Sequence, residues 1–178
     1  MTAGTGSVRV FVACSLDGFI AGPGDDLSWL PAVEPGGEDY GYGAFMAETE
    51  AILMGRRTYD VAAGFDRWPY GEMPVFVATS RPLEPAAPTV AAIAGPPSEL
   101  LAEVRRHVDG SIYLDGGALI RSFAAADLIG ELTITVVPII LGRGVPLFAG
   151  APTRRALTLV SATPYPDGLV QLRYVAGG

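Results

Sequence analysis

Apolar β-branched runs alternate with helix-like segments over the first 126 residues, and beyond them the apolar runs follow one another directly. Such alternation indicates a largely parallel central sheet, because a helix must carry the chain back between neighbouring parallel strands. The later runs predict antiparallel strands added at one edge. We therefore expect an α/β fold with a mixed, mostly parallel sheet flanked by helices. The expected strands cover residues 8–14, 51–54, 75–78, 90–94, 111–114, 132–141, 157–162 and 169–175, and the expected helices cover 38–50, 57–63, 98–107 and 116–126.

The chain has the size and composition of one domain. Of its 178 residues, 49% are hydrophobic and 17% are charged, which is a globular balance rather than a disordered one. Residues 2–7 are small and uncharged, so we expect a flexible tail over 1–7 and a single domain over 8–178. The sequence shows no signal peptide and no apolar run of 18 residues, and we expect a cytoplasmic protein without membrane contact.

The charged and sulfur-containing residues exclude several functional classes. The net charge is −7 and all 12 basic residues are arginines without a basic run, which argues against binding nucleic acid or anionic membranes. The absence of lysine excludes Schiff-base chemistry and a P-loop. The single cysteine, Cys14, and the single histidine, His107, exclude an internal disulfide and predict no metal site.

Three polar or glycine-rich turns each follow an expected strand. They are Gly55-Arg56-Arg57-Thr58, Thr79-Ser80-Arg81-Pro82 and Asp115-Gly116-Gly117-Ala118. Free N–H groups at a helix start bind anions, arginines add bidentate donors for phosphate, and glycines let a ligand approach the backbone. Taken alone, each turn is explained at least as well by an ordinary solvated turn. The third turn also lacks the G-x-G-x-x-G spacing of the Rossmann fingerprint.

Together, the three turns favour one kind of ligand. Parallel strands end at the same edge of a sheet, and open α/β sheets bind their ligands outside those ends. Three turns suited to phosphate at one edge predict a dinucleotide with separated phosphates rather than a single small anion.

Five motifs carry a resemblance to a known family. In order along residues 8–175, they are S-L-D-G-F-I-A-G, L-M-G-R-R-T-Y, V-A-T-S-R-P, I-Y-L-D-G-G-A-L-I and V-P-I-I-L-G-R-G-V-P-L-F. The chain resembles the dihydrofolate reductase-like superfamily. It resembles more closely the C-terminal reductase domain of the bifunctional riboflavin-biosynthesis deaminase/reductase and its stand-alone bacterial relatives. No deaminase domain accompanies these motifs.

The resemblance implies a homodimeric, NADPH-dependent reductase acting on a pterin-like or ribosylaminopyrimidine-like small molecule. The first turn would then contact the cofactor's phosphates, and the second would bind the adenosine 2′-phosphate that distinguishes NADPH from NADH. The third turn would line the pyrophosphate and nicotinamide side, and residues near the opening strand would contact the nicotinamide amide. The cofactor-binding residues implied in this way are Ala13, Ile20, Ala21, Gly55, Arg56, Arg57, Thr58, Ser80, Arg81, Asp115, Gly116, Gly117, Ala118, Leu119 and Ile120.

Two carboxylates are candidates for orienting the substrate or relaying a proton. Asp17 directly follows the opening strand, where riboflavin-pathway reductases approach their substrate. Asp39 lies in the first expected helix, where dihydrofolate reductases carry the acid that binds the pterin, and Glu38 and Glu48 are alternatives to it. Asp17 is also an ordinary turn residue, and Asp39 an ordinary acid in the first turn of a helix.

Three functions remain open from the sequence. The first is an NADPH-dependent reductase, in which Trp29 and Tyr40 would wall a flat substrate, although both aromatics also fit a core or a rim. The second is an NADP(H)-binding module without turnover. The third is an apolar scaffold whose dimer contact is its function.

Overall fold

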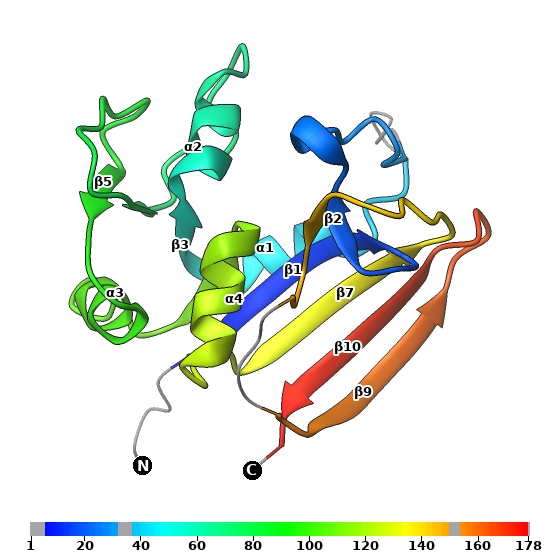
Figure 1. Cartoon of the computed structure of the whole chain (residues 1–178). Coiled ribbons are helices and arrows are strands. Elements are labelled where there is room, and N and C mark those ends of the chain that lie inside the picture. Colours follow the sequence, from blue (N-terminus) through cyan, green and yellow to red (C-terminus); the bar gives the residue numbers. More distant parts are fainter. Residues whose placement is uncertain (1–5, 32–36, 150–153, 178) are drawn as a thin grey trace.

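One sheet organises the molecule. The computed structural model describes residues 6–31, 37–149 and 154–177, and within them eight strands form a sheet in the order β5-β4-β3-β6-β1-β7-β10-β9 (Figure 1). The first six strands in this order pair in parallel, whereas β10 runs antiparallel to both β7 and β9. The predicted mixed sheet with antiparallel C-terminal edge strands is therefore confirmed. The strands are β1 (Val8–Ser15), β3 (Thr49–Gly55), β4 (Val75–Ala78), β5 (Val90–Ile93), β6 (Ser111–Asp115), β7 (Glu131–Val137), β9 (Leu157–Pro164) and β10 (Val170–Ala176).

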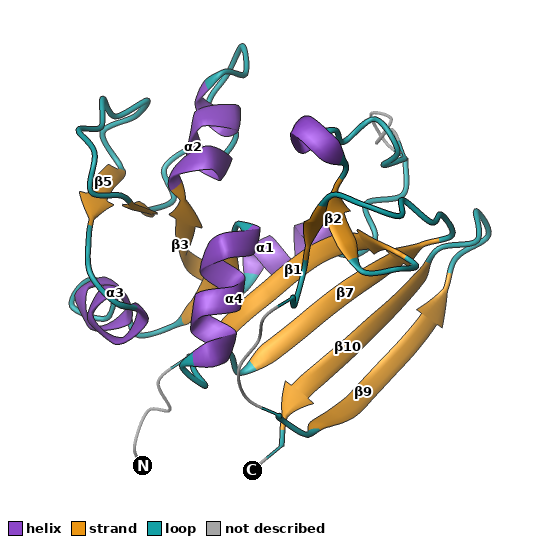
Figure 2. Ribbon diagram, in the orientation of Figure 1, coloured by secondary structure: helices purple, strands orange, loops and turns teal. Residues whose placement is uncertain are grey.

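Helices cover both faces of the sheet (Figure 2). Side chains that alternate along a strand point to opposite faces, so Ile112 and Leu114 of β6 belong to one buried cluster and Tyr113 to the other. The helices α3 (Pro97–Val104) and α4 (Gly117–Ala125) pack on the face of Leu114. The helices α1 (Tyr42–Ala47) and α2 (Arg56–Ala63) contribute buried side chains to the face of Tyr113.

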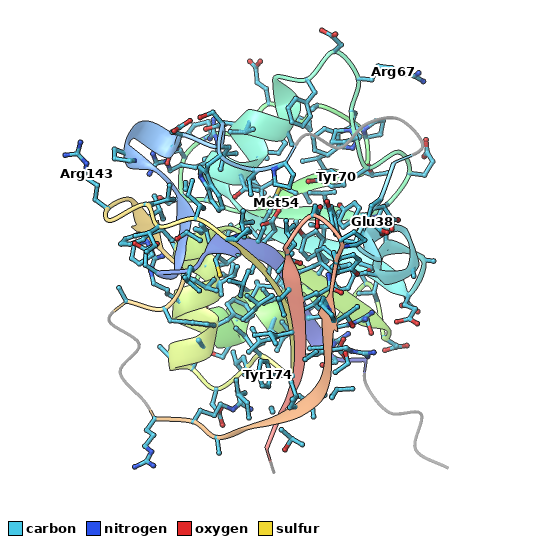
Figure 3. The ribbon with its side chains drawn as sticks, turned by 90° about the vertical axis from the view of Figure 1, so that its right-hand side faces the viewer. Glu38, Met54, Arg67, Tyr70, Arg143 and Tyr174 are labelled. Carbon is cyan, nitrogen blue, oxygen red and sulfur yellow. The ribbon has the colours of Figure 1, made fainter. Side chains whose placement is uncertain are left out.

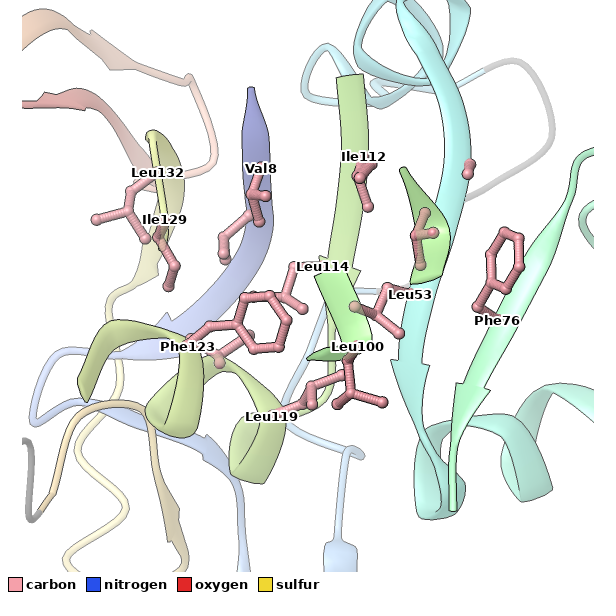
Figure 4. Close-up of a cluster of buried hydrophobic side chains, with 14 of the residues drawn as sticks. Val8, Leu53, Phe76, Leu100, Ile112, Leu114, Leu119, Phe123, Ile129 and Leu132 are labelled. Carbon is pink, nitrogen blue, oxygen red and sulfur yellow. The ribbon is translucent and has the colours of Figure 1, made fainter. Parts of the chain in front are cut away.

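The larger core lies between the sheet and the helices α3 and α4 (Figure 4). Leu53, Leu114 and Phe123 are fully buried there. Burying a side chain of this size contributes about 1.5–3 kcal/mol to folding. Because Phe123 anchors α4 beneath β6, this packing also determines where α4 begins relative to the end of the strand.

The expected helix over residues 38–50 was wrong in its extent, because α1 covers only Tyr42–Ala47. Before the helix, the Asp39 carboxylate accepts hydrogen bonds from the N–H groups of Gly41 (2.8 Å) and Gly43 (2.9 Å). After it, Thr49 already pairs with Ser111 in the sheet and is buried. The local turn chemistry and the pairing of β3 therefore both override the helical pattern.

The expected strand over residues 132–141 is also shorter. The strand β7 ends at Val137, because Pro138 has no N–H group to continue the ladder. A second, two-stranded sheet was not predicted: β2 (Phe19–Ala21) pairs with β8 (Val145–Pro146). Both strands are too short to produce a periodic signal. None of the helices within the described ranges is long and apolar enough to cross a membrane.

A close backbone contact joins the residue before β8 to the end of β2. A Cβ atom at Gly144 would lie 2.0 Å from the carbonyl oxygen of Ala21, and Gly144 has a φ of +147°. Gly142 has a φ of +74°, but a Cβ atom there would meet no atom within 4 Å. Both positions therefore favour glycine for their conformation, but only Gly144 also needs it for space.

We expect Gly144→Ala to destabilise the protein more than Gly142→Ala. The strained backbone alone costs about 1 kcal/mol, so this is the loss expected for Gly142→Ala. The collision with Ala21 adds to that cost, and we expect at least about 2 kcal/mol for Gly144→Ala. Urea unfolding of both variants measures the difference, and equal losses would contradict the contact.

Candidate functional site

The three predicted turns lie side by side at one edge of the sheet, which we call the carboxyl edge. They follow β4, β3 and β6, which are neighbours in this order. The register pairs Gly55 with Ala78 and Met54 with Asp115, so the three strands end almost level. Neighbouring strands are about 4.8 Å apart, a spacing that lets a single extended ligand contact all three turns.

Two helices begin at this edge with open N-termini. The residue before α2 is Gly55 and the residue before α4 is Gly116, and neither helix has a capping side chain or an acid in its first turn. In contrast, α3 carries Glu99 in its first turn. Unbonded N–H groups and the helix dipole favour an anion at such a start. The carboxyl edge thus offers anion-binding donors at the ends of two neighbouring strands.

The glycines of these turns have different surroundings. Gly116 has a φ of +101°, and a Cβ atom there would lie 2.8 Å from Thr58 Oγ1, so the turns after β3 and β6 touch. A Cβ atom at Gly55 would meet nothing within 4 Å. The backbone at Gly55 is therefore approachable from outside, as close binding of a phosphate requires.

The arginines of the first two turns are engaged differently. Arg56 is bound to the protein, since its Nε lies 2.7 Å from Asp60 Oδ1 and its Nη1 donates to the carbonyl of Pro82 at 2.9 Å. Arg57 forms an exposed ion pair with Asp25 of the short 3₁₀ helix η1 (Pro23–Asp25). For Arg81, the structure gives no side-chain partner within the described ranges, and neighbouring Ser80 is exposed. Arg56 therefore joins the two turns, whereas Arg57 and Arg81 can bind an incoming anion.

Residues predicted to contact the nicotinamide lie beside the third turn. Ile20 and Ala21 belong to β2, and a Cβ atom at Gly117 would lie only 2.5 Å from Ile20 Cδ1. Ala13 lies near the end of β1 and pairs with Thr135. The structure thus brings β2 directly over the start of α4.

Two residues of the third motif face the interior instead. Leu119 and Ile120 are buried in the core with exposed fractions of 8% and 1%. The N–H group of Ile120 donates to the carbonyl of Gly116 at 2.8 Å. We therefore set Ile120 aside from the candidate site and retain Leu119 only for its backbone N–H group, while Ala118 is exposed at the helix start.

The Asp17 carboxylate has a structural role. Its carboxylate accepts hydrogen bonds from Ser15 Oγ (2.6 Å) and from the N–H groups of Leu141 (3.1 Å) and Gly142 (2.7 Å). The bond from Ser15, followed by the two backbone bonds, lowers the pKa of Asp17. Asp17 therefore fastens the segment after β7 to the end of β1, and because its lowered pKa keeps it ionised near neutral pH, it carries no proton to donate.

The other three predicted substrate-side residues are likewise held by the chain. The hydrogen bonds of the Asp39 carboxylate to Gly41 and Gly43 lower its pKa. Tyr40 donates its hydroxyl to Asp167 at 2.5 Å, and its carbonyl accepts from Gln171 at 2.8 Å, so it is tied to the β9–β10 hairpin. The indole N–H of Trp29 donates to the carbonyl of Asp26 at 3.0 Å. The contacts do not bring these residues together with the three turns.

A different group of side chains surrounds the end of β6. Tyr113 and Asp115 share one face of this strand, and Tyr42 and Tyr70 pack against the buried cluster that contains Tyr113, with the ring centroids of Tyr42 and Tyr113 6.4 Å apart. Burial, and after it the charge of Asp115, raises the pKa values of all three tyrosines. We call these four residues the tyrosine–aspartate cluster. Burial raises the pKa of Asp115 itself, and the Gly116 amide and Tyr113 hydroxyl oppose that rise. Asp115 holds its proton more tightly than an ordinary aspartate.

Sequence reasoning found only part of this cluster. The alternation of β6 places Tyr113 and Asp115 on one face, which was a usable signal. Tyr42 lies in the predicted helix, where its orientation could not be deduced once the helix was drawn too long. Tyr70 lies on the irregular segment after α2, which has no periodicity.

Comparisons with known proteins agree on one family. Residues 7–171 match the family described as the RibD C-terminal domain. The chain is 32% identical over 168 residues to the uncharacterized protein YwjB of Bacillus subtilis, covering 93% of this chain and 95% of that protein. It is also similar to the crystal structure of a putative riboflavin biosynthesis protein from Shewanella sp. PV-4, with a TM-score of 0.87, 34% identity and coverage of 97% and 99%.

A more distant structure shows the same fold within a larger protein. This is the diaminohydroxyphosphoribosylaminopyrimidine deaminase/5-amino-6-(5-phosphoribosylamino)uracil reductase of Thermotoga maritima, with a TM-score of 0.70 and 16% identity. The match covers 97% of this chain but 57% of the Thermotoga chain. The predicted resemblance in fold to the reductase domain of such bifunctional proteins is confirmed.

The hydrogen bonds of Asp17 predict a pH dependence of stability. Because its folded pKa lies below the unfolded value of about 3.9, the contribution is present above that pH and is lost as the pH falls through the folded pKa. The destabilisation caused by Asp17→Asn should therefore be constant near neutral pH and shrink below about pH 4. Urea unfolding across this range measures it. Asp66→Asn, at an exposed position outside these contacts, is the control, and a pH-independent loss for Asp17→Asn would contradict the argument.

Proposed function

The chain belongs to the RibD C-terminal domain family, and from this premise we propose that it is an NADPH-dependent reductase of a small heterocyclic molecule. The observation that carries the proposal is the pair of open helix starts at the ends of β3 and β6. Beside them, Arg57 has an exposed ion pair that a phosphate can replace, and Arg81 has no side-chain partner within the described ranges. This donor set suits a ligand with several separated negative charges, as a phosphorylated dinucleotide has.

The residues present fit such a cofactor. We assign its pyrophosphate to the N–H groups at the starts of α2 and α4, with Gly55 allowing close approach. We assign its 2′-phosphate to Ser80 and Arg81, because Arg81 is exposed and its turn is held in place by Arg56 through Pro82. Arg57 exchanges Asp25 for a phosphate at little cost, since exposed ion pairs contribute only about 0–1 kcal/mol.

The reaction needs a hydride, a proton and a site that holds the substrate. When bound, NADPH supplies the hydride to an electrophilic carbon of a C=N or C=O bond and is itself oxidised. The nitrogen or oxygen of that bond then takes a proton. Asp115 is the carboxyl suited to hold that proton, because its pKa is raised where those of Asp17 and Asp39 are lowered. This assignment replaces the two carboxylates that the sequence favoured.

The assembly and location follow from the same proposal. We propose a homodimer, supported by the edge strand β9, where Leu157, Leu159 and Val160 are 40%, 53% and 50% exposed. Apolar side chains on a sheet edge favour contact with another chain, which here would be a second copy. We expect the protein to act in the cytoplasm on a freely diffusing small molecule.

Cofactor binding tests the proposal directly. We expect NADPH to bind with a change in its fluorescence, and Arg81→Ala to weaken NADPH by about tenfold or more while affecting NADH much less, because a charge-assisted bond contributes about 1.5–3 kcal/mol. Arg106→Ala, in the exposed turn after α3, is the matched control. Equal losses for both cofactors would remove the 2′-phosphate assignment, and binding of NADPH without its oxidation by any tested substrate would favour a binding module without turnover.

A glycine pair tests how the phosphates approach the backbone. At Gly55, φ is −73° and a Cβ atom would enter open space, so we expect Gly55→Ala to leave the melting temperature unchanged but to weaken NADPH. At Gly116, the positive φ and Thr58 oppose a side chain, so Gly116→Ala should lower the melting temperature by several degrees. Thermal unfolding and fluorescence titration of both variants separate the two effects. Unchanged NADPH affinity in Gly55→Ala would contradict binding at this turn.

A further inference from the structure

The tyrosine–aspartate cluster presents unengaged polar groups at the carboxyl edge. Neither the Tyr42 nor the Tyr70 hydroxyl has a hydrogen-bond partner within the described residues, and neither belongs to the buried unpartnered atoms there, which are Trp68 Nε1 and Thr89 Oγ1. Both hydroxyls are therefore open to a ligand. Asp115 is partly exposed beside them. Two hydroxyls and one carboxyl on the same face of the sheet can recognise ring nitrogens and carbonyls of a small heterocycle.

Aromatic side chains frame these polar groups. Tyr42 meets Tyr113 edge to face at 6.4 Å between ring centroids and Phe11 at 5.5 Å. Tyr70 meets Trp68 edge to face at 5.2 Å. Aromatic pairs of this kind fix ring orientations, and flat rings bind well against them. The surroundings therefore favour a planar ligand.

Within the described residues, no free arginine is available to this cluster. The sequence has no lysine, and all 12 arginines lie in the described ranges, so each basic side chain can be placed. Arg9 is paired with Glu48 and Glu131, and its guanidinium lies over the ring of Phe45, 4.6 Å from the centroid. Arg67 is close in sequence to Tyr70, but its side chain points away from the body of the protein, as does that of Arg143 (Figure 3).

The remaining arginines are engaged elsewhere or belong to the cofactor side. Arg57 and Arg81 are assigned above to the phosphates of the dinucleotide. Arg154 lines a hollow formed with Ala124–Asp127, at the opposite end of α4 from Gly117. The others bind carboxylates or backbone carbonyls of their own surroundings, and they are Arg56, Arg105, Arg106, Arg121, Arg155 and Arg173.

We propose that Tyr42, Tyr70 and Asp115 bind the substrate, and that this substrate is an uncharged planar heterocycle without a phosphate group. The inference rests on the reductase function proposed above and names the substrate class of the same site. Proteins recognise a phosphate with arginine, lysine or an open helix start. Here the start of α4, two residues after Asp115, is assigned above to the pyrophosphate of the cofactor, and its Gly116 N–H group donates to Asp115 Oδ1 at 2.8 Å. On the side of Tyr42, α1 has only six residues and is preceded by the capping carboxylate of Asp39. A phosphate at this cluster would meet Asp115 and no compensating charge.

A pair of substrates differing only in the phosphate tests the proposal. We compare 5-amino-6-(5-phosphoribosylamino)uracil with the same compound after removal of its phosphate, measuring both NADPH oxidation and calorimetric binding to the NADP⁺-loaded enzyme. We expect the unphosphorylated compound to be preferred in kcat/KM by about tenfold or more, since an unpaired charge at a site is costly. Preference for the phosphorylated compound, or no binding of either compound, would overturn the inference.

Conservative variants test the assigned residues. Tyr42→Phe and Tyr70→Phe each remove one hydroxyl and keep the ring, so we expect a several-fold higher KM with an unchanged dissociation constant for NADPH. Asp115→Asn should lower kcat and change its pH profile. Tyr174→Phe, a partly buried position on β10 far from the cluster, is the control (Figure 3). Unchanged kinetic constants in both tyrosine variants would overturn the assignment, whereas failure of NADPH to bind the wild-type protein would instead refute the reductase function.

Discussion

The parallel pairing of β4, β3 and β6 is the constraint on which the candidate site depends. Parallel strands all end at one edge, so each chain reversal after them occurs in the same place. At two of the three ends the reversal leads directly into a helix, and the first N–H groups of that helix point back over the edge. The gathering of helix starts at one edge is therefore a consequence of the topology, and the local residues decide whether their N–H groups stay open.

Those local residues keep two helix starts open and close the others. Glu99 lies in the first turn of α3 and Asp39 caps the turn before α1, whereas α2 and α4, which follow Gly55 and Gly116, have no capping side chain. The N–H group of Gly116 itself donates to Asp115 Oδ1 at 2.8 Å. Arg56 then joins α2 to the turn after β4 through Asp60 and Pro82. In the part of the chain that the structure describes, the edge thus combines rigid support with two helix starts that no side chain caps, which is the arrangement expected of a site that binds a ligand.

The sequence predicted the fold and the position of the three turns, because both depend on local signals. Buried runs such as 75–78 and glycines such as Gly116 and Gly117 are readable without knowledge of distant contacts. The roles of the acids were not readable in the same way. Asp17 is held by Leu141 and Gly142, which lie 124 and 125 residues away, and Tyr40 is held by Asp167. Contacts over such separations arise only from the tertiary fold, so acids that look alike in sequence acquire opposite pKa shifts.

Two neighbouring regions of the carboxyl edge differ in their chemistry. The alternation along β6 directs Asp115 to the face of Tyr113, where Tyr42 and Tyr70 converge and burial favours its protonated form. Arg57, whose exposed ion pair with Asp25 a ligand can replace, lies instead at the end of β3. Arg81, which has no side-chain partner within the described ranges, lies at the end of β4. The region of the arginines therefore favours a ligand with several phosphates, and the region of the tyrosines favours a neutral planar ligand. Because the turns after β3 and β6 touch at Gly116 and Thr58, the two regions are contiguous, as transfer between two bound molecules requires.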